Sequence, residues 1–297
     1  MSDYLVALIA GIVEGLTEFL PVSSTAHIII TNKLLGIDVS SPFWKMFTVV
    51  IQLGAILSVV VYFRHRFVEF LRTFQRSITG RAQPQSALDS QSNLDEQAPA
   101  SPRPWYLQPL ALVAISFVVT AIPCFLMDKW IGENLERPNV IGWALILGGI
   151  AMVAIDRWCE GRASTHRMED VSLRQAIAIG SAQILAATFP GTSRSMSTIA
   201  GGQLMGLSRP VALEFSFFLS VPVMTAAASF KLLQFLIKEP ISLSGSQWLT
   251  LAIGFVTSFV VALAVIAWFM GWVRKHGFAP FALYRIVAGL AVLAWLR

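Results

Sequence analysis

Charged side chains are scarce in this sequence, and cysteine is almost absent. Only 13% of the 297 residues are Asp, Glu, Lys or Arg, whereas 55% are hydrophobic, and the mean hydropathy is +0.66. Soluble domains carry about a quarter charged residues, so the composition excludes an ordinary soluble protein and predicts an integral membrane protein. The two cysteines, Cys124 and Cys159, are expected near opposite membrane faces, which argues against a disulfide between them.

Two further features are lacking. The N-terminus reads MSDYLV, without the basic segment or the cleavage site of a removable signal peptide, so the first apolar stretch is expected to belong to the mature fold. The net charge is only +5, and the arginines cluster in loops. This pattern indicates membrane orientation and contact with lipid headgroups rather than a nucleic-acid partner.

Six apolar runs are long enough to cross a hydrocarbon core of about 30 Å. They lie near residues 43–63, 106–128, 139–158, 211–237, 247–272 and 280–296. Two polar motifs interrupt the remaining apolar sequence, EGLTEFLPVSSTAH at 14–27 and QILAATFPGTSRSMST at 183–198. Each motif contains a proline and follows an apolar stretch that is too short and too polar to cross the bilayer comfortably. This pattern favours two re-entrant helical hairpins. Because non-helical backbone at membrane depth must be surrounded by protein or a water-filled cavity, the hairpins are expected to meet inside the bundle and line a site there.

The two motifs also suggest a duplicated half. Gly11, Glu14 and Pro21 pair with Gly180, Gln183 and Pro190 at a constant offset of 169 residues, and FTVVIQLG (47–54) resembles FSFFLSVP (215–222). Because three crossings separate the two hairpins, the second half is expected to be inverted. We therefore predict an all-α membrane protein with one polytopic domain at 1–297, composed of a first repeat at about 1–78, a mobile cytoplasmic loop at 79–104 and a second repeat at about 172–297.

Basic residues set the orientation. One face holds 13 Lys and Arg residues and the other holds six, so the first is cytoplasmic by the positive-inside rule. Both termini then face outward. Arg194, Lys231 and Arg285 remain inside apolar sequence, where an ionisable group costs at least about 2.5–3.5 kcal/mol, and each needs a partner or a purpose.

The first motif concentrates groups suited to acid–base and nucleophilic chemistry. Glu14 and Glu18 are four residues apart and share one helix face, where two like charges require a cation or a shared proton; the alternative is a polar stripe facing water. Ser24 and His27 are three apart, so a helix beginning after Pro21 places the hydroxyl and the imidazole on one face, as a nucleophile and its base require. The alternative for Ser23 or Ser24 is helix capping alone, and His27 by itself would be read as a hydrogen-bonded core residue.

The second motif suits a phosphate. A glycine-rich turn at a helix N-terminus offers free backbone N–H groups, and an arginine adds bidentate hydrogen bonds; the alternative is an arginine that extends to the membrane interface. The candidate binding residues here are Gly191, Thr192, Ser193, Arg194, Ser195 and Thr198. Gln52, Glu214 and Lys231 are weaker candidates for the cavity wall. Together the motifs favour phosphoryl chemistry on an amphiphile.

Both motifs resemble the signatures of the bacterial undecaprenyl-diphosphate phosphatase family associated with bacitracin resistance. The resemblance extends to FTVVIQLGAILSVVVYFR (47–64) and EFSFFLSVPVM (214–224) and leaves mainly the 79–104 loop unmatched. It implies hydrolysis of undecaprenyl diphosphate to undecaprenyl phosphate and inorganic phosphate, which recycles the lipid carrier for peptidoglycan. It also implies a divalent cation, Mg²⁺ or Ca²⁺, and a bacterial plasma (inner) membrane location with the active site open to the periplasm.

The resemblance assigns roles by motif position. It implies a catalytic set of Glu14, Glu18, Ser24, His27 and Arg194, with the two glutamates also binding the metal. Ser23, Ser193, Ser195 and Thr198 match hydroxyl positions of the motifs, and the predicted substrate-binding set also includes Thr25, Gln52, Gly191 and Thr192. Ala26 and Met196 stand where the family usually has glycine, so Met196 predicts either an ordinary helical backbone or a reshaped pocket.

The sequence leaves several alternatives open. Ser24 and His27 are placed either for a covalent phosphoenzyme or for activation of water. Inverted repeats with broken helices also occur in transporters, so a lipid flippase is the main rival function, and a non-catalytic scaffold comes last. The substrate chain length and the oligomeric state, with a homodimer as one alternative, are not fixed.

Overall fold

A computed structural model describes residues 1–38, 41–79, 103–134, 137–238 and 243–295. The described chain is helical throughout, as predicted, with one isolated bridge between Thr165 and Leu207 as its only β pairing. Its elements are α1 (Asp3–Thr17), α2 (Ser24–Leu35), α3 (Pro42–Tyr62), α4 (Arg64–Thr79), η1 (Trp105–Leu107), α5 (Pro109–Asn134), α6 (Pro138–Trp158), η2 (Met168–Asp170), α7 (Leu173–Thr188), α8 (Arg194–Leu204), α9 (Arg209–Lys238), α10 (Gly245–Val273) and α11 (Ala279–Trp295).

The six predicted crossings correspond to α3, α5, α6, α9, α10 and α11. Five of these are long and apolar enough to span a bilayer, whereas α11 is a shorter apolar helix over Ala279–Ala294. The protein is thus an all-α integral membrane protein. Cys124 and Cys159 are free thiols, as expected. The predicted loop at 79–104 lies almost wholly outside the described residues.

Each polar motif folds as two helices joined by a short turn. In the first, α1 ends at Thr17 and α2 begins at Ser24; in the second, α7 ends at Thr188 and α8 begins at Arg194. The residue before each second helix is a serine in the left-handed region, Ser23 with φ 74° and Ser193 with φ 75°. No other non-glycine residue in the described chain has a positive φ. The helical hairpins therefore form where predicted, while their path through the bilayer remains a prediction.

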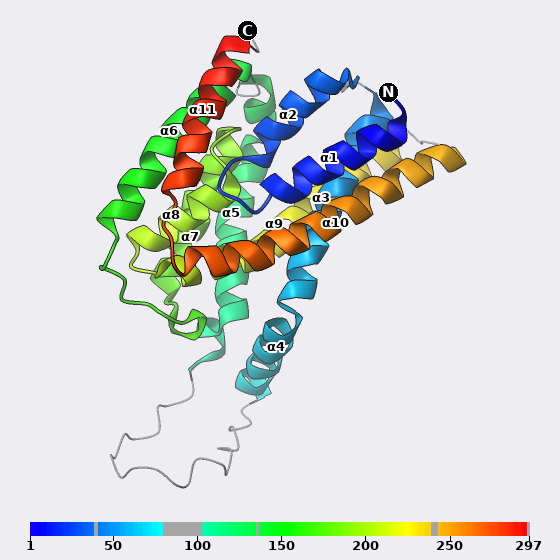
Figure 1. The fold of residues 1–297 in the computed structure, drawn as a ribbon. Helices are drawn as coiled ribbons and strands as arrows, with labels where there is room; N and C mark the ends of the chain where they lie inside the picture. Colours follow the sequence, from blue (N-terminus) through cyan, green and yellow to red (C-terminus); the bar gives the residue numbers. More distant parts are fainter. Residues whose placement is uncertain (39–40, 80–102, 135–136, 239–242, 296–297) are drawn as a thin grey trace, which may run out of the picture.

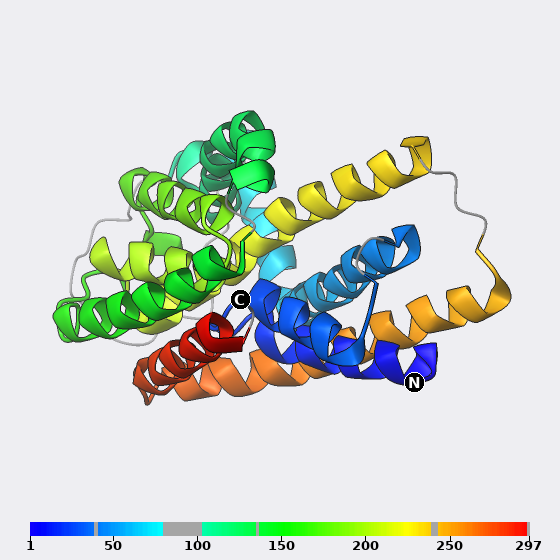
Figure 2. The same ribbon diagram turned by 90° about the horizontal axis from the view of Figure 1, so that it is seen from above.

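The two halves pack alike. Helix α10 lies against α1 and α3, whereas α5 lies against α7 and α9. In Figure 2, α1 and α3 (blue) lie with α10 (orange) on one side and α5 and α7 (green) on the other, and α9 (yellow) extends from the green helices past α3. Gly11 of α1 and Gly180 of α7 make the close approaches: a Cβ at Gly11 would lie 2.8 Å from Gly254 O, and one at Gly180 would lie 2.6 Å from Ser116 O. This pattern of helix contacts is the one expected if the second half repeats the first. The inverted orientation of the second half stays a prediction.

Polar networks tie the bundle together at the end that carries α4. Arg66 of α4 contacts Glu169 of η2 at 2.8 Å and Glu214 of α9 at 3.2 Å. Asp156 of α6 accepts hydrogen bonds from Arg209 at 2.6 Å, from the Gln203 side chain at 3.0 Å and from Phe278 N at 3.1 Å. The start of α1 and the end of α11 both lie on the side of the bundle away from α4 (Figure 1), as expected for two helix ends at one membrane face.

Replacing Gly180 with alanine should destabilise the protein. The new Cβ would meet the backbone of α5 at Ser116, so α7 must shift away at a cost of about 1–3 kcal/mol. We expect a lower midpoint of thermal unfolding in detergent. Gly271→Ala is the matched control, because nothing lies within 4 Å of a Cβ at that helical position, and it should leave the midpoint unchanged or raise it. Equal midpoints for both variants would contradict this packing.

Candidate functional site

A cavity of about 540 Å³ lies between the two hairpins and helices α3, α5 and α9. Its polar wall contains residues from both motifs and from α3. These are Glu18, Ser23, Ser24 and Thr25 of the first motif, Gln183, Gly191, Ser193 and Arg194 of the second, and Gln52. The part of the lining that α5 and α9 contribute is largely apolar and includes Phe117 and Phe125 of α5 and Phe230 of α9. The cavity therefore has a polar end formed by the broken helices and an apolar end.

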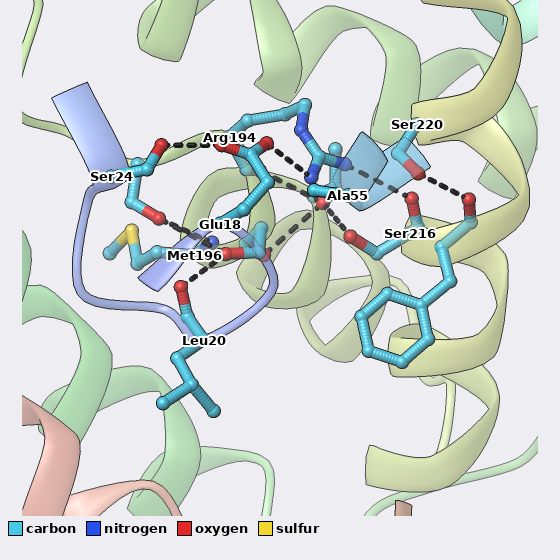
Figure 3. A network of polar contacts seen from close by, with 12 residues as sticks. Glu18, Leu20, Ser24, Ala55, Arg194, Met196, Ser216 and Ser220 are labelled. Atoms are coloured by element: carbon cyan, nitrogen blue, oxygen red, sulfur yellow. Dashed lines mark hydrogen bonds and ion pairs between the residues drawn. The ribbon is translucent and has the colours of Figure 1, made fainter. Parts of the chain in front are cut away.

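Glu18 is the centre of the polar end. It follows the last residue of α1, and its side chain is buried. The Ser24 hydroxyl donates to Glu18 Oε2 at 2.5 Å, and Arg194 Nη2 donates to Glu18 Oε1 at 3.1 Å. Figure 3 shows the carboxylate lying between these two partners. Because Ser24 opens α2 and Arg194 opens α8, this one carboxylate joins both hairpins.

The unwound turns are held by buried donors. Arg285 of α11 is fully buried, and its guanidinium donates to Pro21 O at 3.0 Å, Gly191 O at 3.1 Å and Ala144 O at 3.2 Å. It therefore contacts both turns at once. The sequence indicated only that Arg285 needs a partner, because an arginine within apolar sequence costs free energy. The structure shows that its partners are backbone carbonyls. Arg285 is the main site-forming residue that the predicted set omitted.

Three hydroxyl residues of the second motif lie away from the cavity, and two of them, Ser195 and Thr198, have hydrogen-bond partners within the bundle. The Ser195 hydroxyl donates to Leu20 O at 2.9 Å, and Thr198 shares a hydrogen bond of 2.6 Å with the Ser216 hydroxyl. Both side chains are completely buried. Thr192 lines an apolar groove between α6, α7 and α8. None of the three lines the cavity, so their predicted substrate contacts are corrected: the Ser195 and Thr198 hydroxyls instead join the second hairpin to the first hairpin and to α9.

The predicted pairing of Ser24 with His27 is also corrected. His27 Nδ1 lies 2.7 Å from Ser23 O, and Nε2 lies 2.6 Å from the Tyr284 hydroxyl. A carbonyl only accepts, so Nδ1 carries the proton and Nε2 of the neutral ring accepts from Tyr284. The imidazole stacks on the Tyr284 ring, with centroids 5.5 Å apart. The group that meets Ser24 is Glu18, and His27 instead links α2 to α11.

The remaining motif positions have simple local explanations. Ser23 occupies the N-cap position of α2, but its side chain makes no capping hydrogen bond, whereas the Ser193 hydroxyl does accept from Met196 N. Met196 is buried within the regular helix α8. Of the two alternatives for methionine at this position, the structure shows the ordinary helical backbone. Ala26 is buried in α2.

Glu14 lies one turn before Glu18 and is completely buried. Glu18 N donates to Glu14 O at 2.9 Å, so the helix is continuous between them and both carboxylates lie on one face. Both carboxylate oxygens of Glu14 lack a hydrogen-bond partner in the described structure. Glu14 lines a second cavity of about 700 Å³, whose wall shares Thr25, Gln52 and Lys231 with the first. The two cavities are therefore neighbours across a common wall.

Fold and site together define a polytopic membrane protein whose cavity combines the polar groups of two broken-helix motifs with apolar side chains. A family model described as "Bacitracin resistance protein BacA" matches residues 7–291, and the chain belongs to this family. It is 50% identical over 303 residues to the undecaprenyl-diphosphatase of Koribacter versatilis, covering 99% of each chain. It is 42% identical to that of Novosphingobium aromaticivorans, covering 100% of this chain and 99% of the relative, and 40% identical to that of Caldanaerobacter subterraneus subsp. tengcongensis, covering 97% and 94%.

The left-handed backbone at Ser23 predicts a specific order of stability. Valine is β-branched and rarely adopts a positive φ, so Ser23→Val should cost about 1–3 kcal/mol. Ser23→Gly should stay close to wild type, because glycine adopts this region freely. Thermal unfolding in detergent measures the difference, with Ser181→Val at an exposed helical position as the control for the substitution itself. A Ser23→Val protein as stable as Ser23→Gly would show that the turn does not need this conformation.

Proposed function

We propose that this protein hydrolyses undecaprenyl diphosphate to undecaprenyl phosphate and inorganic phosphate, and so recycles the lipid carrier for cell-envelope synthesis and confers bacitracin resistance. The observation that carries this proposal is the Ser24–Glu18–Arg194 link, which places a hydroxyl, a carboxylate and a guanidinium at the polar end of one cavity. The relatives are named undecaprenyl-diphosphatases, and these three groups suit the hydrolysis of a diphosphate.

Each of the three groups has a distinct task in this proposal. Arg194 and the N-terminal amides of α8 bind the diphosphate and stabilise the charge that develops in the transition state. Ser24 attacks the terminal phosphorus, the bond to the bridging oxygen breaks, and undecaprenyl phosphate leaves with that oxygen. Glu18 accepts the Ser24 proton, as its 2.5 Å hydrogen bond to the hydroxyl suits. Water then hydrolyses the phosphoserine and releases inorganic phosphate.

We also propose a divalent cation, Mg²⁺ or Ca²⁺, at Glu14 and Glu18. The residues fit such an ion, because the buried Glu14 carboxylate has two oxygens without a partner and carboxylate oxygen is the ligand that these cations prefer. No group of three or more His, Cys, Asp or Glu side chains that could hold a metal occurs among the described residues. A site with two carboxylates is typical of Mg²⁺, which completes its shell with water and substrate phosphate. The cation would offset the charge of the diphosphate.

The apolar end of the cavity suits the prenyl chain. Phe125 and Phe230 lie on α5 and α9 with ring centroids 6.2 Å apart, and both are exposed. We propose that the chain leaves the cavity between these two helices and enters the lipid. We further propose an inner-membrane location, periplasmic termini and a cavity open to the periplasm, which the distribution of Lys and Arg supports. A homodimer remains a prediction.

Arg194→Lys should reduce phosphate release from the C55 diphosphate by about 100- to 1,000-fold, the loss typical of removing one group that stabilises transition-state charge. Ser24→Ala removes the nucleophile and should reduce it at least as much. Lysine retains the charge of Arg194 but loses its bidentate geometry. The measurement is inorganic phosphate released by purified protein in detergent with added cation. Arg72→Lys, on the exposed face of α4, is the matched control and should retain full activity.

Two results would overturn parts of this proposal. If wild-type protein released no phosphate but moved the lipid between leaflets of a vesicle, the flippase alternative would replace it. If acid quenching of a reaction with ³²P in the terminal phosphate left no label on Ser24, while wild type turned over normally, direct attack by water would replace the covalent step.

Glu14→Gln should raise the cation concentration required for half-maximal activity by about ten-fold or more, because an amide is a weaker ligand than a carboxylate. Binding of ⁴⁵Ca²⁺ in equilibrium dialysis should weaken in parallel. Glu160→Gln is the control, since Glu160 is exposed on the loop after α6. An unchanged cation requirement in the Glu14 variant would exclude this carboxylate as a ligand.

A further inference from the structure

Gln183 is a buried polar residue without a partner. It lies on α7 with an exposed fraction of 2%, and neither Oε1 nor Nε2 has a hydrogen-bond partner in the described structure. The side chain nevertheless lines the cavity that contains Glu18 and Arg194. A buried amide that makes no hydrogen bonds costs free energy, so its position in this wall calls for a ligand.

The surrounding packing holds Gln183 in this position. Three residues earlier, Gly180 brings the backbone of α7 against Ser116 of α5. The Thr120 hydroxyl donates to Ser116 O at 2.9 Å and to Gly180 O at 2.8 Å, so its proton is already committed to the helix contact. Thr120 lines the same cavity and thus has no proton left for the Gln183 carbonyl.

The internal repeat gives Gln183 an informative counterpart. At the offset of 169 residues it corresponds to Glu14, and each follows by three positions a glycine, Gly11 or Gly180, that packs against the crossing helix. Both side chains are buried with unpartnered polar atoms. One position therefore carries a carboxylate and the other a neutral amide. The amide supplies N–H donors, whereas a third carboxylate near Glu14 and Glu18 would repel a diphosphate.

We propose that Gln183 is a substrate-binding residue whose amide N–H group donates a hydrogen bond to a non-bridging oxygen of the diphosphate held by Arg194. This inference rests on the proposed function. Gln183 contacts the substrate headgroup from α7, Arg194 contacts it from α8, and the buried amide gains its missing partner when substrate enters.

The test compares Gln183→Met and Gln183→Glu with wild type. Methionine keeps the length of the side chain without its donors, and glutamate replaces the donors by a negative charge. The probe is a non-hydrolysable prenyl methylenediphosphonate, whose dissociation constant is measured by calorimetry in detergent. We expect affinity to fall about ten-fold or more for methionine, the range for a hydrogen bond to a charged group, and further for glutamate. KM for the C55 diphosphate should rise in the same order.

Thermal unfolding distinguishes binding from a structural role. Because methionine removes a buried amide without a partner, Gln183→Met should be as stable as wild type or more stable. Gln75→Met, at an exposed position of α4, is the matched control and should change neither quantity. Unchanged affinity in both Gln183 variants, with wild type active, would refute this inference alone. A loss of stability that matches the loss of affinity would assign Gln183 to packing, and an inactive wild type would refute the proposed function itself.

Discussion

The constraint on which this structure depends is the need of unwound backbone for hydrogen-bond partners inside an apolar bundle. Where α1 and α7 end, carbonyls of the following turns lose their helical donors, and lipid offers none. Arg285 supplies donors to both turns, and the Ser195 hydroxyl supplies one to Leu20 O. Arginine suits this task because one planar group carries five N–H donors.

The rest of the bundle is arranged to admit that guanidinium. Arg285 comes from α11, which pairs along its length with α6. Gly148 of α6 lies directly against the guanidinium, and a Cβ there would collide with Nη2. Ala144, one helical turn earlier, provides the third carbonyl. The α6–α11 pair thus serves as the support on which both broken hairpins rest, although neither helix carries a motif residue.

The sequence predicts the helices well because hydropathy and length are local properties, and it predicts the hairpins because a polar, proline-containing motif cannot continue an apolar span. It also predicts that Glu18 and Arg194 share a site. It cannot predict that His27 pairs with Tyr284, since the partner is 257 residues away and depends on how α2 is rotated against α11. The sequence does not predict the buried hydrogen bonds of Ser195 and Thr198 for the same reason. A motif does not show whether a hydroxyl faces the substrate or another group of the protein.

The two hairpins differ by one residue in the spacing between the motif proline and the start of the second helix. One residue separates Pro21 from the left-handed Ser23, whereas two separate Pro190 from the left-handed Ser193. The next residue opens a helix in each case, so Ser24 and Arg194 occupy equivalent starts despite their unequal spacing from proline.

Both side chains then reach Glu18, one as a hydroxyl donor and one as a guanidinium. The position equivalent to Glu18 at the offset of 169 residues is Ala187, so only the first hairpin carries the central acid. The two hairpins supply matching helix starts, and they differ at a few positions: the first carries the Glu18 carboxylate and the Ser24 hydroxyl, and the second carries the positive charge of Arg194. A bound diphosphate would experience attraction from the second hairpin, and the reacting hydroxyl would be supplied by the first.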